Sequence, residues 1–510
     1  MSFLDKIAPR RAVFKTKPGG LAGGQAAADL RLRVGPMILP YSIEPQHILA
    51  VGATGAGKSV VFHRLAAIIR QRPQDRLVIL DPEGALYRCL GRDQDTTANL
   101  FDARAPLWDP VQEIRGEEDV DFFALAVFPR GHGEAEEWYS YGRSILKAIL
   151  ERSPRALPSK LYHRLFLSSR EELREIVKGT PAQRLFEPGA ERMLSGTLGV
   201  LGSHLEWLRY LRDPDRGKPA FTFSNWARNA PPGARLFLPY SARQRSALIP
   251  FYRTVTTLII QELISLPPVP QPVSAGTYRR TWLIADEFGL LGRVGSIEDA
   301  LSNGRRFGVA VAAGFQDIHQ LRASYGRDLT GSLLNNFGSW LVMMMNDGES
   351  AEYFSHALGN IQIKRRLSSS SQGHSGDSSS SNSTSSEQVQ IEPVVLAGEL
   401  LHLPNLEGFL RVRGDPVLHH ISLPPFSWTG PGREWFIPRA KAPLPPPPAG
   451  GGTGPAPPAG GGGPAPGSAP AVVLPGPGPG PVSLDPDAIL KGETDDGEEK
   501  DEDKDGGLEK

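Results

Sequence analysis

The stretch that decides the fold is Gly52-Ala53-Thr54-Gly55-Ala56-Gly57-Lys58-Ser59, which fits the pattern Gly-x-x-x-x-Gly-Lys-Ser. It follows a short apolar run, residues 47–51, and precedes a segment, 59–70, whose apolar residues recur at helical spacing. Strand, glycine-rich loop and helix are the context in which this pattern forms a phosphate-binding loop. The sequence therefore predicts an α/β fold with a P-loop nucleotide-binding domain.

Each residue type in this loop has a chemical reason. Gly55 and Gly57 let successive backbone amides turn toward phosphates, where a Cβ would obstruct the approach. The positive end of the following helix adds to the attraction. Lys58 is predicted to reach the β- and γ-phosphates of ATP, and Ser59 to bind Mg²⁺ through its hydroxyl. The predicted nucleotide-binding residues are Gly52, Ala53, Thr54, Gly55, Ala56, Gly57, Lys58 and Ser59.

A second motif, Thr281-Trp282-Leu283-Ile284-Ala285-Asp286-Glu287, is an apolar run that ends in two acids. Asp286 is predicted to hold the Mg²⁺ shell through water, and Glu287 to orient or deprotonate the attacking water. Alone this signal is weak, because many apolar strands end in an acid. Together with the phosphate-binding loop it predicts Mg²⁺-dependent ATP hydrolysis in which Lys58, Asp286 and Glu287 are catalytic.

Two further strand-like segments end in polar residues: 76–80 ends at Asp81, and 309–314 leads to Gln316. Parallel α/β sheets bind ligands at the carboxyl ends of their strands. We therefore expect four residues at such ends to converge on one site: Gly52, Asp81, Asp286 and Gln316. Gln316 is then a candidate sensor of the γ-phosphate or of the attacking water. The alternative is a loop residue that caps a helix.

An arginine pair, Arg305 and Arg306, follows a helical segment that contains Ile297, Ala300 and Leu301. Isolated arginine pairs at helix ends usually form a solvated face. Because this pair lies close in sequence to the acidic strand, a second interpretation stays open. Arg305 would then reach the γ-phosphate bound by a neighbouring subunit, where negative charge develops during hydrolysis.

Charge is unevenly distributed along the 510 residues, although the formal net charge is zero. Residues 485–510 contain twelve Asp and Glu and four Lys, which gives a net charge of −8, so the rest of the chain carries +8. A basic body fits contact with a polyanion such as DNA, and an acidic tail fits a different, basic partner. A soluble body with a solubilising tail is the alternative.

Composition divides the chain into segments. Glu136–Arg152 and Glu191–Leu211 show helical spacing, and so does Arg243–Ser265, where Pro250 predicts a kink or a late start. The predicted organisation is a flexible N-terminus (1–30), a first part of the P-loop domain (31–133), an all-α insertion (134–228), a second part of the P-loop domain (229–438) with a Ser-rich flexible loop (368–386), a Pro/Gly/Ala linker (439–484) and a disordered acidic tail (485–510).

Compartment signals are few. The single cysteine, Cys89, excludes an intramolecular disulfide and suits a reducing compartment. No apolar run approaches the roughly 18–20 residues that span a bilayer. Residues 1–11 lack the apolar core of a signal peptide. We therefore expect a cytoplasmic protein.

Several motifs, in this order along the chain, resemble those of the type IV coupling proteins of conjugation, and best the TraD/TrwB branch within the HerA/FtsK-like motors. They are Glu44-Pro45-Gln46-His47-Ile48-Leu49, Asp102-Ala103-Arg104, Trp108-Asp109, Asp286-Glu287, Gly304-Arg305-Arg306-Phe307-Gly308, Gly314-Phe315-Gln316, Leu358-Gly359 and Leu403-Pro404-Asn405-Leu406. The resemblance covers residues 32–423.

The resemblance implies a RecA-like nucleotide-binding domain interrupted by an all-α domain, in agreement with the helical patterning of 134–228. It implies a homo-oligomeric ring, a hexamer, that pumps single-stranded DNA without sequence preference toward a secretion channel. Relaxosome and secretion-channel proteins are the implied partners, and ATP and Mg²⁺ the implied cofactors. Carried over by position, the roles are nucleotide and Mg²⁺ binding for Lys58 and Ser59, hydrolysis for Asp286 and Glu287, a finger acting across the subunit interface for Arg305, and a sensor for Gln316.

Members of this family usually begin with two transmembrane helices, for which this sequence offers no candidate. We therefore expect either a partner that anchors the protein to the inner membrane, or a soluble DNA motor outside conjugation. Three functions stay open: an ATPase that couples DNA to a type IV secretion channel, a soluble DNA translocase or helicase, and a nucleotide-gated receptor for secreted proteins. Stimulation of ATP turnover by DNA, and co-purification with a relaxase or channel protein, distinguish them.

Overall fold

The computed structural model describes residues 13–15, 30–131, 133–215, 220–270, 280–375, 378–425 and 432–440. The acidic tail at 485–510, and the linker at 439–484 apart from its first two residues, lie outside the described residues. The same holds for most of the segment 1–30, for which we expected poor order. Within that segment, however, Val13–Lys15 forms strand β1, which pairs in parallel with β14 (Leu418–Ser422). The expectation misses this strand, because an edge strand is held by backbone hydrogen bonds that leave little trace in the sequence.

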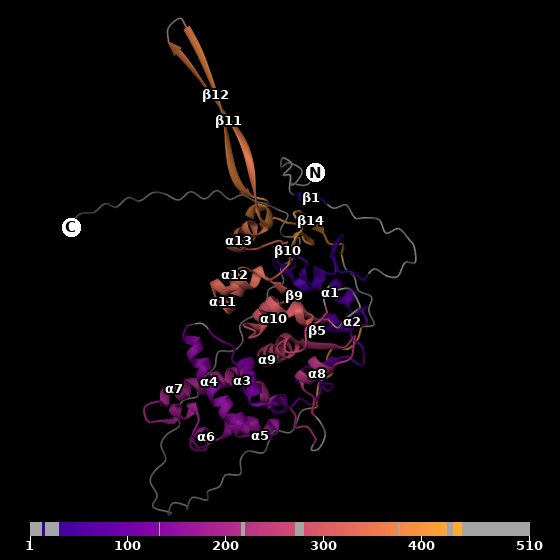
Figure 1. The fold of residues 1–510 in the computed structure, drawn as a ribbon, viewed down its shortest axis with the longest axis vertical. Helices are drawn as coiled ribbons and strands as arrows, with labels where there is room; N and C mark the ends of the chain where they lie inside the picture. Colours follow the sequence, from indigo (N-terminus) through magenta and orange to yellow (C-terminus); the bar gives the residue numbers. More distant parts are fainter. Residues whose placement is uncertain are drawn as a thin grey trace, which may run out of the picture. The chain divides into compact units, whose positions relative to one another are not determined.

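One sheet of ten strands organises the described residues (Figure 1). In sheet order the strands are β1, β14, β13 (Glu407–Val412), β10 (Ser339–Met343), β4 (Ile48–Val51), β9 (Val309–Phe315), β8 (Thr281–Ala285), β5 (Arg76–Pro82), β7 (Arg235–Tyr240) and β6 (Thr96–Thr97). From β10 to β6 every pair is parallel, whereas β13 is antiparallel to both β10 and β14. The predicted α/β fold is confirmed.

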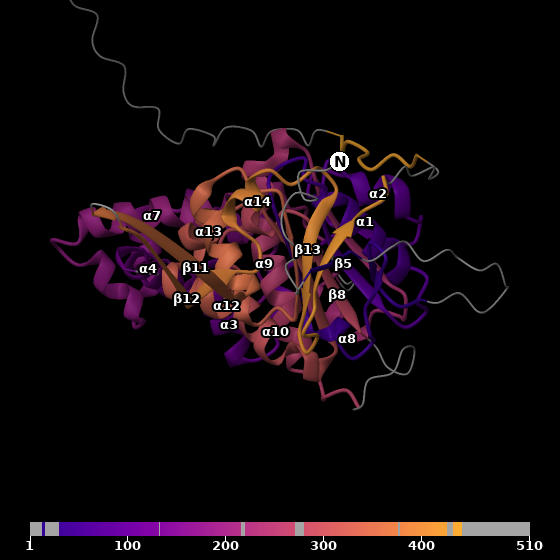
Figure 2. The same cartoon turned by 90° about the horizontal axis from the view of Figure 1, so that it is seen from above.

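Helices cover both faces of this sheet, as strands buried on both sides require. Every residue of β4, β8, β9 and β10 is buried. Successive residues of β4 point to opposite faces: Leu49 and Val51 join one apolar core, and Ile48 and Ala50 the other. Figure 2 shows α1 and α2 on one side of the sheet and α9, α10 and α12 on the other.

The helices that pack on the sheet or on its covering helices have these bounds: α1 (Lys58–Ile69), α2 (Ala85–Leu90), α3 (Glu117–Val127), α8 (Phe223–Asn229), α9 (Arg245–Ile264), α10 (Ile297–Asn303), α11 (Ile318–Tyr325), α12 (Arg327–Asn335), α13 (Gly348–Leu358) and α14 (Ala397–Leu401). Phe62 and Leu65 of α1 are fully buried in the apolar core on one face of the sheet. Burial of one such side chain contributes about 1.5–3 kcal/mol.

The described residues 134–215, which fall in the predicted all-α insertion, form helices and turns only. The helices are α4 (Glu134–Glu151), α5 (Pro158–Tyr162), a π-helical turn (His163–Leu167), α6 (Arg170–Val177) and α7 (Glu191–Leu205), with 3-10 turns at Pro181–Phe186 and Glu206–Tyr210. The structure thus places helices at both segments whose spacing predicted them. In Figure 1 the helices of this insertion lie together beside α3, below α9 and α10.

Helix α9 departs from two expectations. It begins at Arg245, and Pro250 lies inside it, so a late start after the proline is wrong. The segment Ala242–Ile264 is also long and apolar enough to cross a membrane by length and composition, contrary to the expectation that the chain has no such run. Within this segment, 72% of the apolar 18-residue window is buried, and α9 packs against α3 and α8. Its apolar character therefore belongs to a core helix.

The Ser-rich segment 368–386 is a strand pair and not the flexible loop that its composition predicted. Strands β11 (Asn360–Ser375) and β12 (Ser378–Pro393) pair antiparallel along their whole length, with Arg365 opposite Gln388 (Figure 1). Backbone hydrogen bonds hold such a ribbon without any need for apolar side chains. Composition alone is therefore a poor guide here.

Candidate active site

The loop Gly52–Ser59 joins β4 to α1, as predicted. Gly55 and Gly57 have φ angles of +84° and +117°, which side chains rarely adopt. A Cβ on Gly55 would meet no atom within 4 Å, so this part of the loop faces open space. A Cβ on Gly57 would lie 2.7 Å from Cδ2 of Leu406, so this position excludes other residues by space as well as by conformation.

Lys58 begins α1 and turns its side chain back into the loop. Its Nζ donates hydrogen bonds to the carbonyl oxygens of Gly52 and Ala53, at 2.6 and 3.0 Å, and the residue is 7% exposed. Burial lowers the pKa of the Lys58 ammonium, whereas the carboxylates of Asp286 and Glu287 raise it. These contacts place one positive charge between the loop and the two acids.

Ser59 and Asp286 meet, although they are 227 residues apart in sequence. Asp286 directly follows β8, and the Ser59 hydroxyl donates a hydrogen bond to its Oδ2. Burial raises the pKa of Asp286, and the contacts with Ser59 and Lys58 oppose that shift. Two oxygen atoms that could bind a metal ion, one from each motif, therefore lie side by side at the start of α1.

Glu287 and Gln316 form the second contact between motifs. Nε2 of Gln316 donates a hydrogen bond to Oε1 of Glu287 at 2.5 Å. The contact arises because β8 and β9 are neighbours, with Ala285 opposite Ala313. The alternative interpretation of Gln316 as a helix cap is wrong, because Asp317 caps α11 by accepting a hydrogen bond from the Gln320 amide.

Gly314 lets the two strands carry this site. A Cβ at Gly314 would lie 1.9 Å from the carbonyl oxygen of Asp286, closer than any non-bonded contact allows. On the other side of β9, the amide of Gly52 donates to the carbonyl of Phe315 at 3.2 Å. The ends of β4, β9 and β8 thus bring Gly52, Gln316, Asp286 and Glu287 to one edge of the sheet.

Asp81 ends β5 at the same edge but serves a different role from the one expected. Its carboxylate accepts hydrogen bonds from the amides of Leu86 and Tyr87, both at 2.8 Å, and it is 1% exposed. Burial raises the pKa of Asp81 to about 7, and the nearby Asp286 adds to that shift. Asp81 therefore lies at the predicted edge near Asp286, but its carboxylate holds the start of α2.

Arg305 and Arg306 lie at the opposite edge of the sheet. Both are exposed, in a 3-10 turn (Gly304–Phe307) that directly precedes β9, whereas Gln316 follows β9. Seven strand residues span about 23 Å, so neither arginine approaches the phosphate loop of its own chain. The guanidinium of Arg306 lies 5.9 Å from the ring centre of Phe307.

The segment between α14 and β13 covers the phosphate loop, a role that the sequence did not reveal. The amide of Leu406 donates to the carbonyl of Ala56 at 2.9 Å. The residue after β10 also holds the loop, because the amide of Ala53 donates to the carbonyl of Met344 at 2.7 Å. Leu406 has a φ of +66°. Leu406 belongs to the motif Leu403-Pro404-Asn405-Leu406, which is part of the family resemblance and was the available signal in the sequence.

Two other motifs that carry the resemblance are structural. Glu44 is fully buried and pairs with Arg72 and Arg280, at 2.8 and 2.7 Å. Asp102 is also fully buried and binds Arg104 and the amide of Ile437, at 2.8 and 3.0 Å, which ties the end of the described chain to the fold. Breaking such a buried ion pair typically costs about 3–5 kcal/mol.

Comparison with known proteins agrees with this geometry. A family model described as the DNA-binding domain of type IV secretion-system coupling proteins matches residues 31–424. The coupling protein TraD of Escherichia coli K12 is 26% identical over 403 residues, which cover 78% of this chain and 55% of TraD. The chain therefore spans little more than half the length of that relative.

Solved structures of the plasmid coupling protein TrwB share the fold. The complex of TrwB with the non-hydrolysable ATP analogue ADPNP matches with a TM-score of 0.69 and 29% identity, over 81% of this chain and 94% of that chain. The complex of TrwB with ADP and Mg²⁺ matches with a TM-score of 0.68 and 29% identity, over 81% of this chain and 92% of that chain.

Proposed function

The chain belongs to the family of type IV secretion-system coupling proteins, and we propose that it is a DNA-dependent ATPase motor. In this proposal it couples the transfer of single-stranded DNA to a type IV secretion or conjugation channel. It works in the cytoplasm as a homo-oligomeric ring, a hexamer, and reaches the inner membrane through a partner protein. The relaxosome and the secretion channel supply its other partners.

One observation carries the proposal: the two phosphate-site motifs are joined by side-chain contacts. Ser59 contacts Asp286, and Glu287 contacts Gln316, at a single edge of the sheet. The open space beside Gly55 and the left-handed backbone of Gly57 fit a chain of phosphates wrapped by amides. TrwB, which shares this fold, binds an ATP analogue. ATP is therefore the proposed substrate.

The oxygen atoms of Ser59 and Asp286 fit Mg²⁺, which prefers hard oxygen ligands. These two residues would hold the ion, which would supply positive charge to the β- and γ-phosphates. Lys58 adds a second positive charge, carried on a side chain that reaches between the loop and the acids. Glu287, oriented by Gln316, is placed to position a water molecule and accept its proton.

ATP turnover measured with and without single-stranded DNA tests the motor. We expect stimulation by DNA of unrelated sequences, and a stimulation that declines steeply as salt is raised, because phosphate contacts displace counterions. Turnover that is indifferent to DNA would contradict the motor and favour a receptor for protein substrates. Co-purification with a relaxase or a channel protein separates a coupling protein from a soluble translocase.

A further inference from the structure

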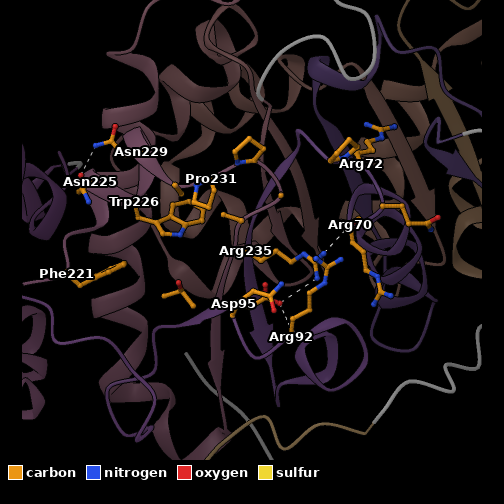
Figure 3. Close-up of a pocket in the computed structure, with 18 residues that line it drawn as sticks. Arg70, Arg72, Arg92, Asp95, Phe221, Asn225, Trp226, Asn229, Pro231 and Arg235 are labelled. Atoms are coloured by element: carbon orange, nitrogen blue, oxygen red, sulfur yellow. Dashed lines mark hydrogen bonds and ion pairs between the residues drawn. The ribbon is translucent and has the colours of Figure 1, made fainter.

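A cavity of about 670 Å³ lies at the amino edge of the sheet, away from the phosphate loop (Figure 3). Its walls come from the end of α1, the segment 92–96, α8 and the turn 231–235. Arg235 is the first residue of β7, and six strand residues place it about 20 Å from the carboxyl edge. Cavities of this volume hold small ligands.

One half of the cavity is strongly basic. The charged residues of this half are three arginines (Arg70, Arg92 and Arg235) and one acid (Asp95), which gives a net charge of +2, whereas the lining residue Arg72 is paired with Glu44 and Asp75. In Figure 3 the side chains of Arg92 and Arg235 lie beside Asp95, and Arg70 lies on the other side of Arg235. Guanidinium groups bind phosphate with two parallel hydrogen bonds. An anion is therefore the ligand that this half fits.

Contacts with backbone carbonyls and with one carboxylate hold Arg235 in place. Arg235 is buried, donates to the carbonyls of Leu90 and Arg70 at 3.0 and 3.3 Å, and lies 3.6 Å from Asp95. Burial lowers the pKa of Arg235, and the positive charges of Arg92 and Arg70 lower it further. A bound phosphate would offset this repulsion among like charges.

The other half is aromatic and carries amide groups. Figure 3 shows Phe221, Trp226, Asn225, Asn229 and Pro231 on the side away from the arginines. The Trp226 ring packs on the guanidinium of Arg76, and Nδ2 of Asn229 donates to Oδ1 of Asn225 at 2.7 Å. Trp226 is buried, so the half-buried Phe221 is the ring that can stack on a nucleobase, and the side-chain amides can pair with base edges.

We propose that this cavity binds a nucleoside phosphate, with the phosphate on the arginines and the base against the aromatic and amide wall. The same chemistry is presented by a free nucleotide and by one unit of a DNA strand. This second nucleotide site is distinct from the ATP site, because the two lie at opposite edges of the sheet. α1 connects them, since Lys58 begins the helix and Arg70 follows its last residue.

The test uses the full chain with the Lys58→Ala change, which removes the main phosphate contact of the ATP site. Calorimetric titration with dAMP measures the affinity of the whole cavity. Titration with inorganic phosphate measures the affinity of the arginine half, and titration with deoxyadenosine measures that of the aromatic half. The pocket variant is Arg70→Gln with Arg92→Gln. The matched control is Arg174→Gln with Arg192→Gln, two exposed arginines of α6 and α7. The exposed Arg92→Gln change is also tested alone, in case the double variant folds poorly.

We expect saturable dAMP binding that weakens by about tenfold or more in the pocket variants and is unchanged in the control, as loss of a charged hydrogen bond predicts. Absent dAMP binding, or equal binding in all variants, would overturn the proposal. Phosphate that binds as tightly as dAMP would overturn the base-binding half. A 5′-phosphorylated oligo(dT) that displaces dAMP identifies a DNA strand as the source, whereas displacement failure identifies a free nucleotide. These measurements need no ATP turnover, so the second site and the motor function can be contradicted independently of each other.

Discussion

Glu287 and Asp286 are neighbours in sequence but differ in what they contact. Asp286 is bound by Ser59 at the start of α1, whereas Glu287 is bound by the amide of Gln316. Asp286 thus contacts Ser59, the other predicted Mg²⁺ ligand. The contact of Glu287 with Gln316 uses one of its carboxylate oxygens, and the other is the predicted contact for water. The two acids can therefore be separated by mutation.

The change Glu287→Gln should preserve ATP binding and slow turnover by about 10²–10⁴-fold, the usual contribution of a general base. The fold should survive, because a glutamine carbonyl can still accept the hydrogen bond from Gln316. Fluorescent-nucleotide binding and steady-state hydrolysis measure the two effects. Lys58→Ala is the comparison, since it should lose hydrolysis through lost phosphate contacts. Equal losses of binding and turnover in Glu287→Gln would show that Glu287 is structural.

Asp81 should make stability depend on pH. Its folded pKa is about 7 against an ordinary value of 3.8, so the folded chain holds a proton that the unfolded chain releases. Its contribution to stability is therefore complete below about pH 4 and is lost as pH rises through about 7, with an upper limit of about 4 kcal/mol. Denaturant unfolding of wild type and Asp81→Asn should show the wild type losing stability relative to the variant between pH 4 and 8. A difference that stays constant over this range would contradict the assignment.

Among the elements, α1 and β9 connect the two edges of the sheet. α1 runs from Lys58 at the phosphate loop to the arginines of the proposed second site, and β9 runs from the turn that carries Arg305 to Gln316. β9 is buried along its whole length and α1 packs on the sheet through one face, so both elements fix the spacing of groups at their two ends. The β11–β12 ribbon differs, because it pairs only with itself in a separate two-stranded sheet.

Shortening this ribbon should therefore leave the nucleotide site intact. Replacing residues 366–387 by Asn-Gly retains the pairing of Arg365 with Gln388, the ion pair of Arg365 with Glu392 and a turn suited to a hairpin. We expect ATP turnover without DNA to be unchanged and Tm to shift by no more than about 2 °C, because a shorter loop costs little entropy. Removing all of 360–393 is the contrasting variant, since β12 also contacts α13. Loss of basal turnover in the short-ribbon variant would show that the ribbon supports the fold.

At the scale of the whole molecule, the two edges of the parallel strands carry different groups. The phosphate loop, Asp286, Glu287 and Gln316 share its carboxyl edge, and Arg305 and the basic cavity lie at its amino edge. A ring of subunits would give the exposed Arg305 a phosphate to contact on a neighbour, which its own chain does not offer.

Arg305→Ala should spare nucleotide binding and lower ATP turnover by about 10³-fold or more, as removal of an arginine finger does. Mixing Arg305→Ala with Lys58→Ala subunits should restore part of the activity, because a mixed interface joins one intact finger to one intact phosphate loop. Turnover measured against protein concentration should also rise more than linearly. Arg306→Ala serves as the matched control from the adjacent position. A mixture that stays inactive would contradict a role across the interface.

The sequence by itself indicated which residue types come together at the nucleotide site. Left-handed backbone at Gly55 and Gly57, the lysine and hydroxyl that follow, and two acids after an apolar strand are local requirements, so they appear as residue types at fixed spacing. The helices α4 and α7 were visible for a similar reason, because helical periodicity is a property of one segment. The order of motifs along the chain also pointed to the family before any contact was known.

Only the tertiary structure decided which of these residues meet. Asp81 ends a strand at the predicted edge, yet the start of α2 takes its carboxylate, and no local pattern distinguishes it from Asp286. The pairing of the Ser-rich strands, the cover of Leu406 over the phosphate loop, and the gathering of Arg70, Arg92 and Arg235 join residues far apart in sequence. Such contacts depend on strand order and packing, which the free energy of the whole fold sets, and a single segment does not encode them.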